Sequence, residues 1–164
     1  MPAAGKTTLG KRLAAALSCH FVDTDALIEE HMGESLQSTL NRQGYLELRE
    51  IEQQVILNTE FDGCVIATGG SAVYGELAMQ KLQGCASIVY LSLSPELLLQ
   101  RINNWQTRGI ACAPNQPFSA LYAEREPLYQ YYANHILDCS SATIEYLTEA
   151  LIEWGDSENR IRRE

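Results

Sequence analysis

The chain begins with a short run that constrains its fold more than any other segment. Residues 1–8 read M-P-A-A-G-K-T-T and match the second half of the phosphate-binding loop G-x-x-x-x-G-K-[ST]. In that loop the backbone N–H groups surround a phosphate, the lysine reaches the β- and γ-phosphates, and the next hydroxyl binds Mg²⁺. A helix that starts near Lys6 adds its own free N–H groups at the same place. The run therefore predicts a site for ATP and Mg²⁺ that is contacted by Ala3, Ala4, Gly5, Lys6, Thr7 and Thr8.

The same run also fits an ordinary N-terminal turn, because Gly-Lys pairs near helix starts often occur by chance. Half of the expected context is present, since Leu9, Leu13 and Leu17 fall on one face of the following segment. The loop's first glycine and the strand that should feed it do not precede Gly5. Residues further along the chain must therefore decide between a nucleotide site and a simple turn.

Composition limits the class of protein. A chain of 164 residues with 46% apolar residues fits one globular domain, which we expect to span residues 1–154 before a charged tail at 155–164. The formal net charge of −9 argues against general binding to nucleic acid or to a membrane surface, because both need basic patches. No apolar run approaches a membrane span, no secretory signal opens the chain, and the five cysteines are scattered singly. We expect a cytoplasmic, monomeric protein.

Strand-like and helix-like segments alternate along the chain. Strands are expected at residues 19–25, 64–68, 87–93 and 135–139, where apolar and β-branched residues cluster. Helices are expected from about residue 6 and at 26–32, 35–42, 44–58, 77–82, 94–105, 118–133 and 142–154, with Ser94 as a cap and Pro95 at the first helical position. Residues 106–117 lack periodicity and are expected to form a mobile loop. This alternation predicts an α/β fold in three layers, with helices on both faces of a parallel sheet.

Polar residues follow two of the expected strands at their C-terminal ends. Asp23 and Asp25 leave one strand, and Gly69 and Gly70 leave another. Ligands of parallel sheets bind beyond these ends, so the residues should meet the loop of Lys6 at one rim. One carboxylate near a metal and one near a hydroxyl is what phosphoryl transfer to an alcohol requires. The alternative is that Asp25 only caps the next helix and Asp23 is a solvated turn residue.

The remaining candidates also have structural alternatives. Gly69 and Gly70 can present N–H donors to a ligand, but they also fit a plain turn. Arg49 and Arg125 lie among glutamates, so surface ion pairs would explain them as well. Arg108 in the expected loop could swing onto ATP phosphates, or it could simply be solvated.

Taken together, these segments resemble the shikimate kinase family. The most specific segments are F-V-D-T-D at 21–25, L-R-E-I-E at 48–52, A-T-G-G at 67–70 and R-E-P-L-Y at 125–129, and the match runs from Gly5 to about Trp154. The resemblance implies a P-loop fold of the nucleoside-monophosphate-kinase type, with a five-stranded parallel sheet and a mobile lid, here at residues 106–118. It also implies transfer of the γ-phosphate of ATP to the 3-hydroxyl of shikimate, with Mg²⁺.

The resemblance assigns roles motif by motif. It implies that Asp25 orients or deprotonates the attacking hydroxyl, that Arg49 and Arg125 hold the carboxylate of shikimate, and that Gly70, beside Gly69, donates its N–H to the substrate. The physics agrees, because guanidinium groups suit a carboxylate and a carboxylate suits hydroxyls. The nucleotide roles that it implies are Mg²⁺ binding by Thr7 and, through water, by Asp23, and phosphate binding by Lys6 and Arg108. It also implies that Arg101 lies near the adenine.

The chain departs from the family pattern at three places. Because the loop's first glycine and first strand are absent, we expect the natural polypeptide to carry roughly ten more N-terminal residues, several of them apolar. Ser71 stands where the family usually has a third glycine, and its Cβ is expected to narrow the substrate rim. R-G-I-A at 108–111 replaces the usual R-P-L-L, which affects the expected lid closure and the choice of substrate.

Two other functions stay open from the sequence. One is a related kinase for gluconate or another hydroxy acid, which would need Lys6 but not both Arg49 and Arg125. The other is a catalytically silent nucleotide-binding or regulatory module, which the incomplete loop and Ser71 favour. The presence of Lys6, Asp25 and both arginines argues against this second alternative.

Overall fold

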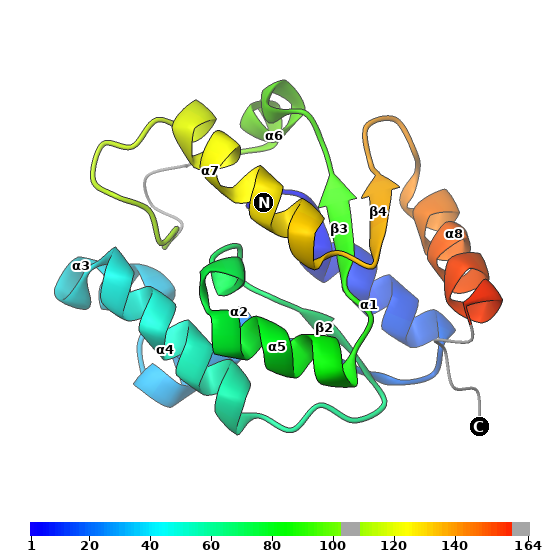
Figure 1. Cartoon of the computed structure of the whole chain (residues 1–164), viewed down its shortest axis with the longest axis horizontal. Coiled ribbons are helices and arrows are strands. Elements are labelled where there is room, and N and C mark those ends of the chain that lie inside the picture. Colours follow the sequence, from blue (N-terminus) through cyan, green and yellow to red (C-terminus); the bar gives the residue numbers. More distant parts are fainter. Residues whose placement is uncertain (103–108, 159–164) are drawn as a thin grey trace.

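The structure is a computed structural model and describes residues 1–102 and 109–158. Its strands are β1 (His20–Asp23), β2 (Cys64–Ala67), β3 (Val89–Ser92) and β4 (His135–Asp138). Its helices are α1 (Lys6–Ala16), α2 (Thr24–Met32), α3 (Leu36–Gln43), α4 (Tyr45–Asn58), the 3-10 helix η1 (Ala72–Tyr74), α5 (Glu76–Cys85), α6 (Pro95–Arg101), α7 (Phe118–Tyr132) and α8 (Ile144–Ser157). The predicted alternation of strands and helices is confirmed (Figure 1).

The described strands form two separate parallel pairs instead of the one sheet expected from the sequence. β1 pairs with β2 in the register His20 to Cys64, and β3 pairs with β4 in the register Val89 to His135. No pairing joins β2 to β3 within residues 1–102 and 109–158. α1 packs against β1 and β2 and also against α8, so it connects the two halves of the molecule. Because each pair is parallel, the C-terminal ends of β1 and β2 lie side by side, and so do those of β3 and β4.

Three apolar clusters form the core. The largest joins Met1 and Leu9 to Leu93, Leu137 and Leu151, and so packs α1 against β4 and α8. The second cluster lies between α4, η1 and α5. The third includes residues of α2 and α4 together with Ala111, and it therefore holds the segment after residue 108 against these two helices.

The strand predicted at residues 19–25 ends earlier than expected. Asp23 is the last residue of β1 and the N-cap of α2, and one of its carboxylate oxygens accepts a hydrogen bond from the backbone N–H of Asp25 at 3.2 Å. This cap starts the helix at Thr24. Asp25 thus lies in the first turn of α2, so the predicted extension of the strand to residue 25 is wrong.

Other boundaries follow local signals to different degrees. Ser94 caps α6 and Pro95 is its first residue, as predicted, but α6 ends at Arg101. Residues 103–108, which include the predicted end of that helix and part of the lid, lie outside the described residues. α8 continues past the expected end at residue 154 to Ser157, because Gly155 is buried on its inner face. No helix within the described residues is long and apolar enough to cross a membrane.

Candidate active site

The loop before α1 has the backbone geometry of an anion-binding turn. Gly5 is the N-cap of α1 and adopts a left-handed conformation with φ of 91°, and Ala3 also has a positive φ of 58°. Gly5 offers no side chain to the N–H groups of the first turn, so these donors remain for a ligand. The ammonium group of Lys6 donates to the carbonyl of Met1 at 2.9 Å, which folds the lysine back over the loop.

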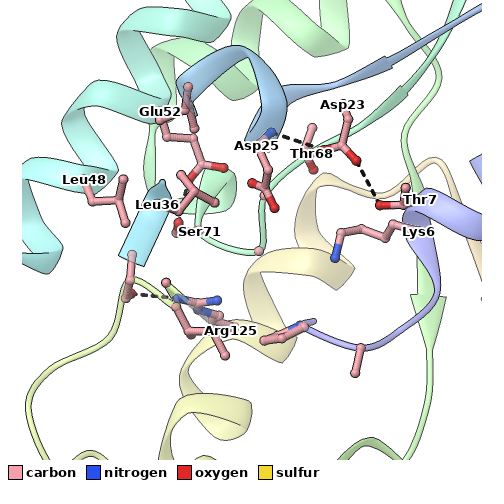
Figure 2. A pocket seen from close by; sticks show the side chains of 18 of the residues that line it. Lys6, Thr7, Asp23, Asp25, Leu36, Leu48, Glu52, Thr68, Ser71 and Arg125 are labelled. Carbon is pink, nitrogen blue, oxygen red and sulfur yellow. Dashed lines mark hydrogen bonds between the residues drawn. The ribbon is translucent and has the colours of Figure 1, made fainter. Parts of the chain in front are cut away.

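A threonine and an aspartate meet beside this loop. The hydroxyl of Thr7 donates to Asp23 at 2.9 Å, while the other oxygen of Asp23 caps α2 (Figure 2). Mg²⁺ in phosphoryl-transfer sites usually takes one or two protein oxygens, with waters and phosphates as its other ligands. Thr7 and Asp23 fit this role. The described residues contain no group of three or more His, Cys, Asp or Glu side chains that could hold a metal ion, and a site of this kind does not need one.

A cavity of about 400 Å³ joins the loop to the C-terminal ends of β1 and β2. Figure 2 shows Lys6, Asp25 and Arg125 pointing toward one another into this space. The predicted site residues that line the cavity are Ala3, Gly5, Lys6, Thr7, Thr8, Asp23, Asp25, Gly69, Gly70, Arg101 and Arg125. Ala4 does not line it, because its side chain is buried in the core beside α1. Arg108 lies outside the described residues.

Two arginines from different helices converge on a single backbone oxygen. Arg49 of α4 donates to the carbonyl of Ala111 at 3.1 and 3.3 Å, and Arg125 of α7 donates to the same oxygen at 2.8 Å. Their guanidinium groups both lie over the ring of Tyr74, at 3.5 Å for Arg49 and 5.3 Å for Arg125. Two fork-shaped cations around one acceptor are suited to hold a carboxylate.

The ion-pair explanation for the two arginines holds only in part. Arg49 lies 3.8 Å from Glu124, which is too long for a strong pair, and it makes its hydrogen bonds to Ala111 instead. Arg125 is only 1% exposed, so it is not a solvated surface residue. Its donors reach the carbonyl of Ala111 and the hydroxyl of Tyr74, both neutral acceptors. A buried cation whose described acceptors are neutral favours an anionic ligand.

Burial shifts the ionisation of the groups that face the cavity. It raises the pKa of Asp25, although the nearby Lys6 opposes this, and it lowers the pKa of Lys6, which Asp25 and Glu52 oppose. The pKa of Glu52 is raised to about 7, chiefly by burial. A carboxyl group with a raised pKa beside a cation is a stronger base than a solvated carboxylate, and such groups often perform proton transfer.

Gly69 and Gly70 are required here by lack of space. A Cβ on Gly69 would lie 2.2 Å from an oxygen of Glu52 and 2.6 Å from one of Asp25, and a Cβ on Gly70 would lie 2.9 Å from Arg125. The N–H of Gly69 already donates to Thr24 at 3.0 Å, so this amide holds the turn against α2. The carbonyl of Gly70 accepts from the hydroxyl of Tyr129 at 2.6 Å, which fixes the orientation of the turn.

Sequence reasoning missed several residues of the site. Glu52 and Tyr129 were noted only as parts of motifs, yet each follows a site arginine by three or four positions on the same helix. That spacing places both on the inward helix face and could have identified them. Tyr74 and the carbonyl of Ala111 carry no such signal, because only the folded chain brings them to the arginines.

Comparisons with known proteins agree with this geometry. A family model described as shikimate kinase matches residues 2–155. The shikimate kinase of Mycobacterium avium (strain 104) is 35% identical over 159 residues, covering 92% of this chain and 89% of the relative. That of Caldanaerobacter subterraneus subsp. tengcongensis is 32% identical over 151 residues, covering 90% and 88%.

Solved structures give the same result. The structure of shikimate kinase from Acinetobacter baumannii in complex with shikimate has a TM-score of 0.85 and 27% identity, and the match covers 98% of this chain and 90% of that one. Shikimate kinase from Bacteroides thetaiotaomicron has a TM-score of 0.80 at 28% identity, with coverage of 95% and 94%. The chain therefore belongs to the shikimate kinase family.

Proposed function

We propose that this shikimate kinase transfers the γ-phosphate of ATP to the 3-hydroxyl of shikimate in the cavity between Lys6, Asp25 and Arg125. The observation that carries the proposal is the convergence of Arg49 and Arg125 on the carbonyl of Ala111. Ala111 and Arg125 line the same cavity as the phosphate loop, whereas Arg49 is not among the lining residues. A substrate with a carboxylate at one end and a hydroxyl at the other matches this arrangement. Asp25 lines the same cavity, which supports its role as a base between the carboxylate end and the hydroxyl end of the substrate.

At the carboxylate end, shikimate would take the place of the Ala111 carbonyl. Both guanidinium groups already point at one acceptor, so little side-chain reorganisation is needed to hold a carboxylate. Hydrogen bonds between charged groups are shorter and stronger than those to a neutral carbonyl, which favours the exchange. The N–H of Gly70, next to the buried Arg125, would contact the substrate from the adjoining turn.

At the hydroxyl end, Asp25 would accept the proton of the attacking 3-hydroxyl. Its pKa is raised by burial, so it is a better base than a solvated aspartate, and the nearby cation of Lys6 opposes part of this rise. The position of Asp25 in the first turn of α2 is held by the Asp23 cap. The side chain that would bind phosphate, Lys6, therefore lies beside the side chain that would accept the proton, Asp25.

At the nucleotide end, the loop at residues 3–8 would hold the phosphates with its backbone N–H groups and Lys6. Thr7 and Asp23 would hold Mg²⁺, Asp23 through water, and Arg101 on the cavity wall would lie near the adenine. Bound Mg²⁺ neutralises charge on the transferring phosphoryl group. Arg108 on the phosphates, a lid, a monomeric state and a cytoplasmic location stay predictions.

An acceptor comparison tests this function. ADP release from ATP and Mg²⁺ is measured with shikimate, with gluconate and with no acceptor. We expect turnover only with shikimate. Turnover only with gluconate would select a related hydroxy-acid kinase, and ATP binding without any turnover would select a silent nucleotide-binding module.

A further inference from the structure

The residue that departs from the family pattern makes a buried hydrogen bond next to the site. Ser71 and Glu52 are 8% and 2% exposed, and the hydroxyl of Ser71 donates to the Oε2 atom of Glu52. A glycine at position 71 would offer no such donor. The bond connects the turn after β2 to helix α4, and both residues line the cavity (Figure 2).

The second oxygen of Glu52, a residue that lines the cavity, lies close to Asp25. Its Oε1 atom is buried and has no hydrogen-bond partner among the described residues. A Cβ on Gly69 would lie 2.2 Å from this oxygen and 2.6 Å from an oxygen of Asp25. Two carboxylate oxygens are therefore neighbours on one wall, and one of them lacks a donor. A buried acceptor without a donor is costly, so a bound ligand that supplies an O–H or N–H gains at this place.

Charged groups on three other elements face Glu52. Asp25 of α2 raises its pKa, whereas Arg125 of α7 and Lys6 of α1 lower it, as does the hydrogen bond from Ser71. Burial outweighs the lowering effects and places the pKa at about 7. Above that pH the free oxygen is part of a carboxylate and can only accept hydrogen bonds.

We propose that Ser71 is a positioning residue that holds Glu52 so that its free oxygen accepts a hydrogen bond from a second ring hydroxyl of the substrate. The pair would then act beside Asp25 as a determinant of specificity for polyhydroxylated acids. Ser71 itself does not contact the reacting atoms. This inference rests on the proposed binding of shikimate in the cavity.

Calorimetric titration of shikimate into the whole protein, with ADP and Mg²⁺ present, tests the pair. We expect Ser71→Ala and Glu52→Gln each to weaken shikimate binding by about tenfold, and the double variant to be little weaker than either single one. Ser119→Ala and Glu47→Gln, both exposed, are matched controls and should bind as the wild type does. ADP affinity and melting temperature show that each variant is folded. If Ser71→Ala does not fold, Ser71→Gly removes the same hydroxyl.

Two further readouts separate positioning from a merely structural role. Binding is also measured with two analogues of shikimate, one without the 4-hydroxyl and one without the 5-hydroxyl. For one of these analogues, Ser71→Ala should bind as tightly as the wild type does. Shikimate affinity of the wild type should change near pH 7, and Ser71→Ala should move this change to higher pH, because the donor that lowers the pKa of Glu52 is lost.

The outcomes are distinct. Failure of the wild type to bind shikimate overturns the proposed function and the inference with it. Normal wild-type binding with equal losses for shikimate and both analogues, or with additive effects of the two substitutions, overturns the role of Ser71 alone.

Discussion

Buried ionisable side chains dominate the site at the scale of single residues. Glu52 and Arg125 are almost fully buried, and Lys6 and Asp25 are half-buried beside them. Burial disfavours the charged forms of Lys6, Asp25 and Glu52, and the attraction of neighbouring opposite charges only partly compensates. The site is therefore less stable than an apolar core would be, which is common where side chains are arranged for binding or catalysis.

The raised pKa of Glu52 predicts a specific dependence of stability on pH. Glu52 has an ordinary pKa of 4.5 and a pKa of about 7 in the folded chain, so the native state holds this proton more tightly than the unfolded state. Between these values the free energy of unfolding should fall as pH rises, by about 3 kcal/mol from this residue. The contribution is fully present below pH 4.5 and is lost by the time the pH exceeds about 7.

Urea unfolding of the wild type and Glu52→Gln at several pH values measures this effect. The difference in unfolding free energy should shift in favour of Glu52→Gln as pH rises through the window. The exposed Glu47→Gln is the control and should follow the wild type. If the unfolding free energies of the wild type and Glu52→Gln change in parallel with pH, Glu52 does not titrate as described.

Arg49→Ala should weaken the binding of shikimate and leave ATP binding intact. The substitution removes one of the two cations that meet at the Ala111 oxygen. Loss of a charge-assisted hydrogen bond of this kind should raise the KM for shikimate by about 10- to 100-fold. Steady-state kinetics with each substrate varied in turn measure the effect. Arg42→Ala is the matched control, since Arg42 lies on the exposed face of α3 and pairs with Glu34.

At the scale of elements, a glycine connects the segment after residue 108 to α3. Gly109 has a φ of 63°, and its N–H donates to the side chain of Gln37 at 2.7 Å. A Cβ at this position would lie 2.7 Å from the Cβ of Leu36 and 2.9 Å from the backbone nitrogen of Gln37. These contacts hold Ala111, two residues further on, where both arginines reach its carbonyl.

Gly109→Ala should therefore disturb the substrate end of the cavity. We expect a loss of about 1–3 kcal/mol in stability, from left-handed backbone strain and the clash with α3, together with weaker shikimate binding. Gly84→Ala in α5 is the control, because nothing lies within 4 Å of its Cβ position. That control should gain about 0.5–1 kcal/mol, as alanine favours helix. Thermal unfolding and shikimate titration together check both variants, and an unperturbed Gly109→Ala would contradict the account.

Sequence predicts elements well where caps and breakers are explicit. Ser94 and Pro95 mark the start of α6, as the structure confirms. The predicted break after residue 32 falls at Gly33, which ends α2 in a left-handed conformation. Asp23 is a harder case, because the same residue can end a strand, cap a helix and bind Thr7, and it does all three. Pairing between strands depends on contacts distant in sequence, which explains why the division into two strand pairs was not predictable.

At the scale of the whole molecule, the site lies where the phosphate loop, α4 and α7 meet. The phosphate loop and α1 belong to the cluster that contains Leu137 and Leu151, whereas Arg49 lies on α4 and Arg125 on α7. The family resemblance identified these residues from short motifs. The geometry that makes them a site, including the oxygen of Ala111 and the ring of Tyr74, comes from packing between the parts and is not encoded in any one segment.

Ligand binding should therefore stabilise the molecule as a whole. Shikimate at 100 times its dissociation constant should raise the free energy of unfolding by about 2.7 kcal/mol, because the unfolded chain has no cavity. The rise should shrink in Arg49→Ala at the same shikimate concentration, while the response to ATP with Mg²⁺ stays the same. Differential scanning calorimetry measures both responses, and an equal shikimate response in the wild type and in Arg49→Ala would contradict the proposed carboxylate site.

The central claim is that Asp25 activates a hydroxyl of shikimate beside the phosphate held by Lys6. The most direct test is shikimate-dependent ADP release by Asp25→Asn, compared with the wild type and with Asp62→Asn, whose side chain is exposed. ATP affinity is measured in parallel by calorimetry. We predict that Asp25→Asn lowers turnover by about 10²- to 10⁴-fold with ATP affinity unchanged, and that Asp62→Asn matches the wild type. Turnover of Asp25→Asn within a few-fold of the wild type would contradict the account.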